Sequence, residues 1–577
     1  MAASLDPRLL TPHSPRRFVP ADVDLRDRSV VAALFENLLQ RTPESPQDLA
    51  DWLAAYSELQ AAVDQQSALL YVNMTCHTDE PAHADAYKAF VESVLPAMKP
   101  LQDRAKKAFV DAKRRLAPGD QRLALLDRKW RADIERYRDE NVPLETRDEL
   151  LSQEYQRICG AMTVIYDNEE RTLPQMALYQ MKNDRAVREE AWRATARRRL
   201  QDRERIETVF DRMLDIRNRI ALNAGCADFV DYQFRALHRF DYTREHCLEY
   251  HDAVQRCVVP VWARVLRRRQ NALGVETLRP WDTTVDVLGR DPLRPFDTAD
   301  ELIDKCAQVF HRTHAQFGEQ FDEMKMLGLL DLASRKGKAP GGYQHLFAEA
   351  RKPFIFMNAV GIDADLRTLL HEGGHAFHAL ASIHEPVYPY RRAPIEFCEV
   401  ASFGMELLGG EFLDIFYSDP EARRSRRDFF EGKIALLAWV ATVDAFQHWL
   451  YTHPGHTRDE RREEWIRTYD RFGGGVIDWS GLDEERAFLW HRQPHFFVTP
   501  LYYIEYGIAQ LGALQVWLHA RREPAAALRD YRRALALGGS RPLPELFDAA
   551  GLRFDFSEKA IRPLVDAVQA ELDRLDQ

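Results

Sequence analysis

The stretch that decides the fold is LLHEGGHAFHAL, which runs from Leu369 to Leu380. Its apolar residues follow the three- and four-residue spacing of a helix, and Asp363 or Asp365 could cap the start of that helix. Two glycines, Gly373 and Gly374, interrupt the pattern, although each costs about 1 kcal/mol relative to alanine in a helix. A role other than helix stability is therefore expected for this pair.

The same helix carries histidines at the spacing of a metal site. His371 and His375 are four residues apart, so they share one helix face and can bind one ion. Glu372 lies one residue further round, where a carboxylate can take a proton from a metal-bound water. The segment HRQPH, residues 491–495, repeats the histidine spacing, but Pro494 would disrupt a helix there. It is therefore expected to be a poor metal site.

A catalytic zinc ion needs a third protein ligand and one open position. The candidates lie in a second helix-like run, RRAPIEFCEVASFGMELL, which begins near Pro394 and contains Glu396, Glu399 and Glu406. Spacing alone does not choose among the three glutamates. The two glycines of the first helix would remove side chains where this second helix, or a substrate, comes close.

Long helical periodicity dominates the first half of the chain. Helices are expected over residues 45–72, 84–116, 148–170, 183–225 and 244–273. The clearest strand is PFIFMNAVG, residues 353–361, which is either a buried strand or one whose backbone pairs with an extended peptide. The pattern predicts a largely α-helical body with a small sheet near the histidine helix.

Composition excludes several classes of protein. The formal net charge is -11 without a dominant charged tail, which gives no indication of a nucleic-acid partner. The seven cysteines are scattered without a CxxC pair, which favours a reducing compartment and a cytoplasmic protein. The sequence contains no apolar run of about 18 residues, so no membrane span is expected. Residues 1–18 show no apolar signal segment.

The motifs TLLHEGGHAFH and FCEVASFGMELL resemble the thimet oligopeptidase family of zinc metallopeptidases, most closely its oligoendopeptidase F and Pz-peptidase branch. Segments such as PHFFVTPLYYIEYGIAQLGAL extend the similarity over most of the chain. The resemblance implies Glu399 as the third zinc ligand and Glu406 as a group that orients a ligand. It also aligns His495, Tyr502 and Tyr506 with substrate-binding residues, of which Tyr502 and Tyr506 would share a helix face.

The resemblance further implies a mainly α, neurolysin-like fold, with two helical lobes, a deep substrate channel and a small β-sheet whose edge strand holds the substrate beside the HEXXH zinc helix. We expect an N-terminal helical region over residues 1–190 and a catalytic region over 191–577 that contributes to both lobes. One Zn²⁺ per chain is expected. The implied function is an endopeptidase that hydrolyses short unstructured oligopeptides by attack of a zinc-bound water activated by Glu372.

Two alternatives stay open at this point. A zinc carboxypeptidase on a similar helical scaffold also uses H-E-x-x-H, and it would release residues from the peptide end instead of cutting internally. A non-catalytic helical protein that binds peptides would carry the motif without using it. The sequence does not predict the oligomeric state.

Overall fold

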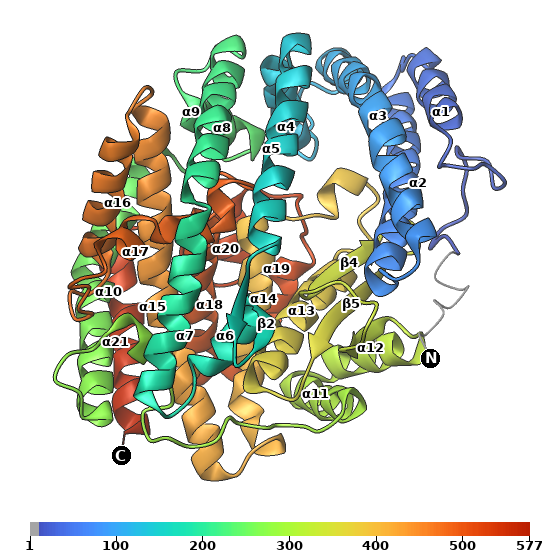
Figure 1. Ribbon diagram of the computed structural model, residues 1–577. Coiled ribbons are helices and arrows are strands. Elements are labelled where there is room, and N and C mark those ends of the chain that lie inside the picture. The colour runs from blue at the N-terminus through green and yellow to red at the C-terminus, as the bar shows by residue number, and fades with distance from the viewer. Residues whose placement is uncertain (1–10, 577) are drawn as a thin grey trace. The chain divides into compact units, whose positions relative to one another are not determined.

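The computed structural model describes residues 11–576 and is built mainly from helices (Figure 1). Helices make up 69% of the chain and strands 5%, which confirms the mainly α prediction. The first ten residues, where part of the N-terminal prediction falls, lie outside the described residues. Within residues 11–576, no helix has the length and apolar character needed to cross a membrane. None of the seven cysteines, all of which lie within residues 11–576, forms a disulfide bond.

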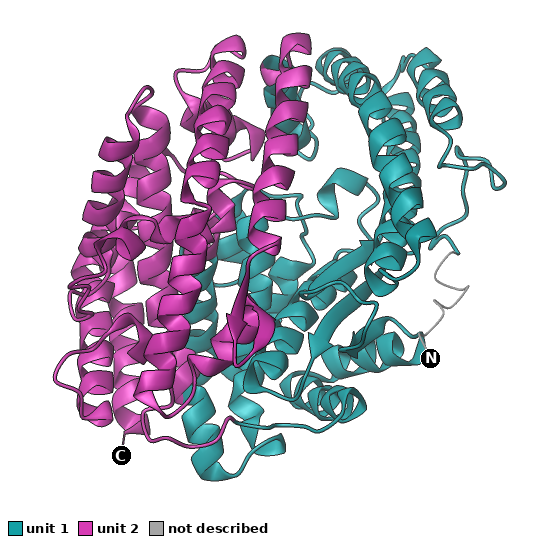
Figure 2. Cartoon of the chain, in the orientation of Figure 1, with its two compact units in different colours: residues 1–135, 293–426, 509–554 teal, residues 136–292, 427–508, 555–577 magenta. Residues whose placement is uncertain are grey.

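The chain forms two compact units, each assembled from separate segments (Figure 2). Unit 1 contains the residues up to 135, 293–426 and 509–554, and unit 2 contains residues 136–292, 427–508 and those from 555 onward. The predicted boundary at residue 190 matches no boundary of either unit. The division into residues 1–190 and 191–577 therefore stays a prediction.

The helices and strands follow one another along the chain as in Figure 1. The first half contains α1 (Arg28–Gln40), α2 (Pro46–Cys76), α3 (Pro81–Leu116), α4 (Ala124–Arg136), α5 (Val142–Gly160), β1 (Thr163–Tyr166), β2 (Glu169–Thr172), α6 (Leu173–Tyr179), α7 (Arg185–Gln201), α8 (Arg203–Asn223), α9 (Phe229–Ala236) and α10 (Arg244–Leu273). The second half contains α11 (Ala299–Thr313), α12 (Ala315–Met326), β3 (Leu330–Ala333), β4 (Tyr343–Phe347), β5 (Lys352–Ala359), α13 (Asp363–Ala381), α14 (Ile395–Gly409), α15 (Asp419–Thr452), α16 (Arg458–Phe472), α17 (Asp483–Ala487), α18 (Ile504–Arg522), α19 (Pro524–Leu535), α20 (Leu543–Ala549) and α21 (Glu558–Leu575).

Three of the predicted long helices are confirmed, as α2, α3 and α10. The start of α2 follows its capping signal: the Ser45 hydroxyl accepts the backbone N–H of Asp48, and the Asp48 carboxylate accepts the backbone N–H of Ser45. Pro46 occupies the first turn, where its missing N–H costs nothing. Helix α10 ends at Gly274, whose φ of 63° is a left-handed conformation that glycine adopts freely.

Two predicted helices are shorter than expected. The run over residues 148–170 ends as helix at Gly160, and its remainder forms the β1–β2 hairpin. The turn residues Asp167 and Asn168 have φ of 52° and 60°, which suits a two-residue hairpin turn and not a helix. The run over residues 183–225 is divided at Asp202 into α7 and α8. Apolar spacing persists across the break at Gly160, with Met162 and Ile165 after Ile158, so periodicity did not reveal it. At Asp202 the polar run over residues 201–205 does interrupt the spacing.

A three-stranded sheet in unit 1 has the strand order β3-β5-β4. The predicted strand over residues 353–361 is β5, which pairs in parallel with β3 and antiparallel with β4. Of the two readings of this strand, the buried strand is confirmed, and the strand that pairs its backbone with a peptide is wrong, because β5 is bonded on both sides. The apolar sequence of β5 indicates that the strand is buried, but it does not indicate which strands pair with it. The edge strands are β3 and β4.

The loop from β5 to α13 fixes the start of the histidine helix. The Asp365 carboxylate accepts the backbone N–H groups of Val360, Gly361 and Ile362 at 2.8, 2.9 and 3.0 Å. Ile362 is the residue that precedes the helix, so Asp365 caps it from within the first turn. Asp363 has another role, since its carboxylate accepts the Tyr417 hydroxyl at 2.7 Å.

Candidate metal centre

Unit 1 brings together the three residues predicted to bind the metal. His371 and His375 extend from α13, and Glu399 extends from α14, which packs against it. One ligand atom from each residue lies within 4.8 Å of the others. The Glu399 Oε2 atom is 3.3 Å from His371 Nε2 and 3.6 Å from His375 Nε2. Two imidazoles and one carboxylate are a donor set typical of catalytic zinc.

Two further side chains orient these candidate ligands. Glu406 Oε1 lies 2.6 Å from His371 Nδ1, so this carboxylate accepts the Nδ1 proton and leaves Nε2 directed at the cluster. The Ser402 hydroxyl donates to Glu399 Oε2 at 2.9 Å. Glu406 is 6% exposed and Ser402 is fully buried, so bulk water does not compete for either hydrogen bond.

The charges around the cluster also fit a cation. Burial favours neutral His371, but hydrogen bonds with Glu399 and Glu406 outweigh it and raise the His371 pKa to about 10. Burial disfavours ionised Glu399, but the neighbouring His371 and His375 keep its pKa below the usual value. Burial lowers the pKa of His375 to about 4, which leaves a neutral imidazole. The carboxylates of Glu399 and Glu406 thus stabilise positive charge at the cluster, and His375 offers a neutral imidazole nitrogen there. A divalent metal ion fits both features.

Glu372 lies beside the cluster and is 7% exposed. Burial raises its pKa to about 7, and nearby His371 partly opposes that shift. The backbone of Gln344, on β4, also opposes the shift. A carboxylate whose pKa lies near neutrality suits a general base. Sequence reasoning missed Gln344 because a backbone group leaves no side-chain signal.

The two glycines of α13 make room for different neighbours. A Cβ atom on Gly374 would lie 2.6 Å from the Ser402 Cα atom and 2.7 Å from the Ala401 carbonyl oxygen, both on α14. A Cβ atom on Gly373 would instead lie 2.6 Å from the ring of Phe310, on α11. Gly374 therefore lets the Glu399 helix approach, as expected, whereas Gly373 accommodates a core side chain.

His495, Tyr502 and Tyr506 form an aromatic group in unit 2. The His495 ring centroid lies 6.1 Å from that of Tyr502 and 5.9 Å from that of Tyr506. The two tyrosine rings are 5.4 Å apart. The prediction that both tyrosines share a helix face was wrong, because α18 begins at Ile504 and Tyr502 precedes it. Leu501, with a φ of 61°, redirects the chain just before Tyr502. The turn brings the rings together without a common helix.

The segment HRQPH, which is expected to be a poor metal site, does not form a single helix. His491 and His495 lie in two separate short 3₁₀ helices, Leu489–Arg492 and Pro494–Phe496. His491 is 3% exposed, and its Nε2 atom lies 2.8 Å from Glu207 Oε1. The two histidines therefore do not present their rings from one helix face.

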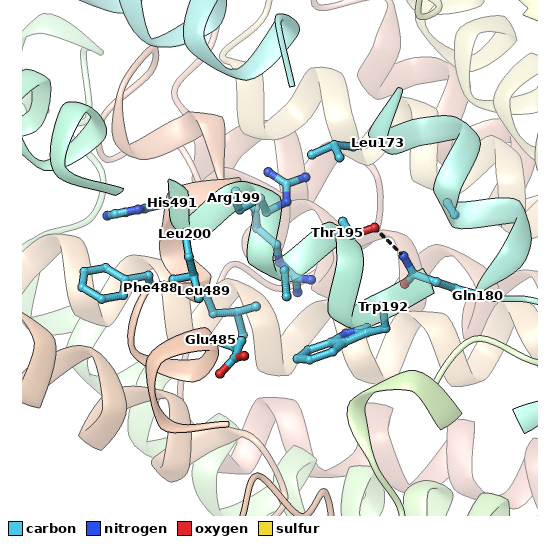
Figure 3. Close-up of a pocket in the computed structure, with 13 residues that line it drawn as sticks. Leu173, Gln180, Trp192, Thr195, Arg199, Leu200, Glu485, Phe488, Leu489 and His491 are labelled. Carbon is cyan, nitrogen blue, oxygen red and sulfur yellow. Dashed lines mark hydrogen bonds between the residues drawn. The ribbon is translucent and has the colours of Figure 1, made fainter. Parts of the chain in front are cut away.

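His491 also lines a cavity of about 200 Å³ within unit 2 (Figure 3). The wall includes Trp192 and Arg199 of α7 and Phe488, which follows α17. Neither the metal cluster nor the group of His495, Tyr502 and Tyr506 lines this cavity. It is therefore separate from the predicted peptidase residues.

Comparison with known proteins gives the family. The model of Peptidase family M3, whose members are generally zinc metallopeptidases, matches residues 178–565, more than half of the chain. Oligopeptidase PepF of Bacillus subtilis (strain 168) is 26% identical over 277 residues, which cover 46% of this chain and 40% of that protein. The match thus spans less than half of the relative's length.

Two solved structures extend the similarity to nearly the whole fold. A structure provisionally named as an oligoendopeptidase F has a TM-score of 0.88 and 27% identity, covering 97% of this chain and 99% of the other. Pz peptidase A, solved with an inhibitor, has a TM-score of 0.87 and 26% identity at the same coverage. These comparisons agree with the resemblance seen in the motifs. The chain belongs to Peptidase family M3.

Proposed function

We propose that this chain is a zinc-dependent endopeptidase that hydrolyses short, unstructured oligopeptides. The observation that carries the proposal is the convergence of His371, His375 and Glu399 beside the buried Glu372. Membership of Peptidase family M3 supports it, as does the similarity to oligopeptidase PepF and Pz peptidase A. His371, His375 and Glu399 would hold one catalytic zinc ion.

In the proposed mechanism, the residues of this chain carry out the proton transfers. When bound, zinc supplies a Lewis acid that polarises the peptide carbonyl and acidifies water. Glu372 removes a proton from the attacking water and delivers it to the leaving amine. Glu406 and Ser402 maintain the orientation of His371 and Glu399.

The sheet suggests how an extended peptide binds. Strand β4 is an edge strand, so its outer backbone groups are not paired with another strand. A substrate that adds to this edge would be recognised through its own backbone, with little demand on its side chains. The link from Gln344 of β4 to Glu372 would place such a peptide close to the catalytic base.

The first prediction concerns the type of cleavage. A fluorogenic peptide blocked at both ends should be cleaved internally, because recognition through β4 needs no free terminus. A chelator should abolish cleavage, and added zinc should restore it. Mass spectrometry of the products, with and without chelator, identifies the bond that is cut.

Two outcomes would contradict this prediction. An intact blocked peptide, with trimming of the unblocked one from its carboxyl end, would indicate a carboxypeptidase. Undiminished cleavage after the metal has been removed would exclude zinc chemistry. As a matched control, the same peptide with methylated backbone nitrogens around the cleaved bond should be a poorer substrate, since methylation removes strand hydrogen bonds.

We also propose that His495, Tyr502 and Tyr506 contact the substrate and that one tyrosine hydroxyl stabilises the oxyanion. Tyr502→Phe or Tyr506→Phe should then lower kcat by roughly 10²–10³-fold, the usual effect of losing one oxyanion donor. Tyr503→Phe is the matched control, because its ring lies only 4.6 Å from that of His495 but is not part of the predicted set. Steady-state kinetics that rank all three variants alike would assign the tyrosines to packing.

A further inference from the structure

A second group of metal-binding residue types lies in unit 2, on helices α10 and α15 (Figure 1). Cys247 and His251 are four residues apart on α10, and Asp444 and His448 are four apart on α15. Each pair therefore shares a helix face. The Cys247 sulfur, an Asp444 carboxylate oxygen and a His448 ring nitrogen lie within 4.8 Å of one another.

This group is removed from water. Cys247, His251 and Asp444 are fully buried, and His448 is 3% exposed. Within residues 11–576, the ion pairs of Asp444 involve only histidines, His251 and His448, and no lysine or arginine. A buried carboxylate in such a setting requires positive charge from nearby.

The hydrogen bonds within the group leave several polar atoms unmatched. His251 Nε2 lies 2.8 Å from Asp444 Oδ2, a normal hydrogen bond. His448 Nε2 is 3.4 Å from that oxygen, beyond the normal range. Among the described residues, both ring nitrogens of His448 and the Oδ1 atom of Asp444 make no hydrogen bond. Buried polar atoms nearly always have a partner, so these atoms indicate a ligand.

We infer that Cys247, Asp444 and His448 form a second metal site, separate from the candidate catalytic centre. The donor set of thiolate, imidazole and carboxylate suits zinc or cobalt better than magnesium or calcium, which prefer oxygen ligands alone. His251 holds the Asp444 carboxylate through their hydrogen bond and so orients a ligand. Because its ligands come from both helices, the ion would tie α10 to α15 within unit 2.

The test uses the full chain carrying His371→Ala and His375→Ala, so that a catalytic ion does not contribute. This protein is produced in cobalt-supplemented medium, and cobalt is counted by elemental analysis. The expected result is about one equivalent per chain. A thiolate-to-cobalt charge-transfer absorption should accompany it, because Cys247 is the only sulfur ligand proposed at either site.

Cys247→Ser should abolish both the absorption and the retained cobalt. Cys257→Ser is the matched control, since Cys257 is a second buried cysteine of α10 and should leave both unchanged. His448→Gln should reduce cobalt retention too, and it provides an independent test if Cys247→Ser does not fold. Bound metal should also raise Tm by several degrees in the parent and in Cys257→Ser, but not in Cys247→Ser.

A parent that retains no cobalt would overturn the inference. So would retained cobalt without the sulfur band and equal in Cys247→Ser and Cys257→Ser. In either case the group is a metal-free buried network. Peptide cleavage plays no part in these measurements, so the second site and the proposed peptidase mechanism can fail independently.

Discussion

Glu372→Gln should leave the zinc content unchanged and lower kcat by roughly 10²–10⁴-fold, the range associated with losing a general base. Glutamine preserves the size of the side chain, but it does not accept the proton of the attacking water. The metal should stay because the donor atoms belong to His371, His375 and Glu399. Elemental analysis and kcat measured on the same preparation test both parts.

Glu396→Gln is the matched control for this substitution. Glu396 is 4% exposed and lies on α14, but it is not part of the metal cluster. Its variant should keep both zinc and activity if it folds, as circular dichroism can verify. If Glu372→Gln retained full activity, Glu372 would not be the base. If it lost its metal, the assignment of Glu372 as a group outside the ligand set would be wrong.

Gly374→Leu should abolish zinc binding and remove most of the peptidase activity. Helix propensity alone predicts the opposite direction, since leucine favours a helix over glycine by close to 1 kcal/mol. The first added carbon, however, would lie 2.6 Å from the backbone of Ser402 on α14. Because the added carbon is fixed to the backbone of α13 and the atoms that it meets are backbone atoms of α14, the two helices must move apart. That movement separates Glu399 from His371 and His375.

The effect of Gly374→Leu can be measured as zinc affinity and as the free energy of unfolding. Gly374→Ala, which adds only the clashing carbon, should already weaken zinc binding at least tenfold. Gly432→Ala supplies the propensity control, because Gly432 lies inside α15 and a Cβ atom there meets nothing within 4 Å. It should stabilise the chain by up to about 1 kcal/mol. A Gly374→Ala protein with normal zinc affinity would show that the glycine is merely tolerated.

The local pattern of the sequence was sufficient for most helices and for the metal-binding motif. The four-residue spacing of His371 and His375 fixes a shared face once the helix forms, whatever surrounds it. The capping residues of α2 act within one turn, so their effect is also visible in the sequence. Motif resemblance then selected Glu399 from three glutamates, a choice that spacing alone left open.

Properties that depend on neighbours were not available from local patterns. The apolar run of β5 indicated burial, but its central position in the sheet depends on β3 and β4. Tyr502 and Tyr506 have helical spacing, yet the turn at Leu501 places Tyr502 before the helix. The peptide-pairing reading of β5 and the shared face of the two tyrosines failed because periodicity describes one segment, whereas strand order and chain reversals depend on several.

The sequence by itself determined the helical character of the chain, the HEXXH helix and the peptidase family. The tertiary structure alone decided which groups surround those residues: Glu406 on His371, the Gln344 backbone on Glu372, and α14 against Gly374. It also brought Cys247 beside Asp444, residues from segments far apart in the chain. The reason is physical. Backbone propensity and side-chain periodicity act over a few residues, whereas burial, charge and ligand geometry arise only when distant segments pack together.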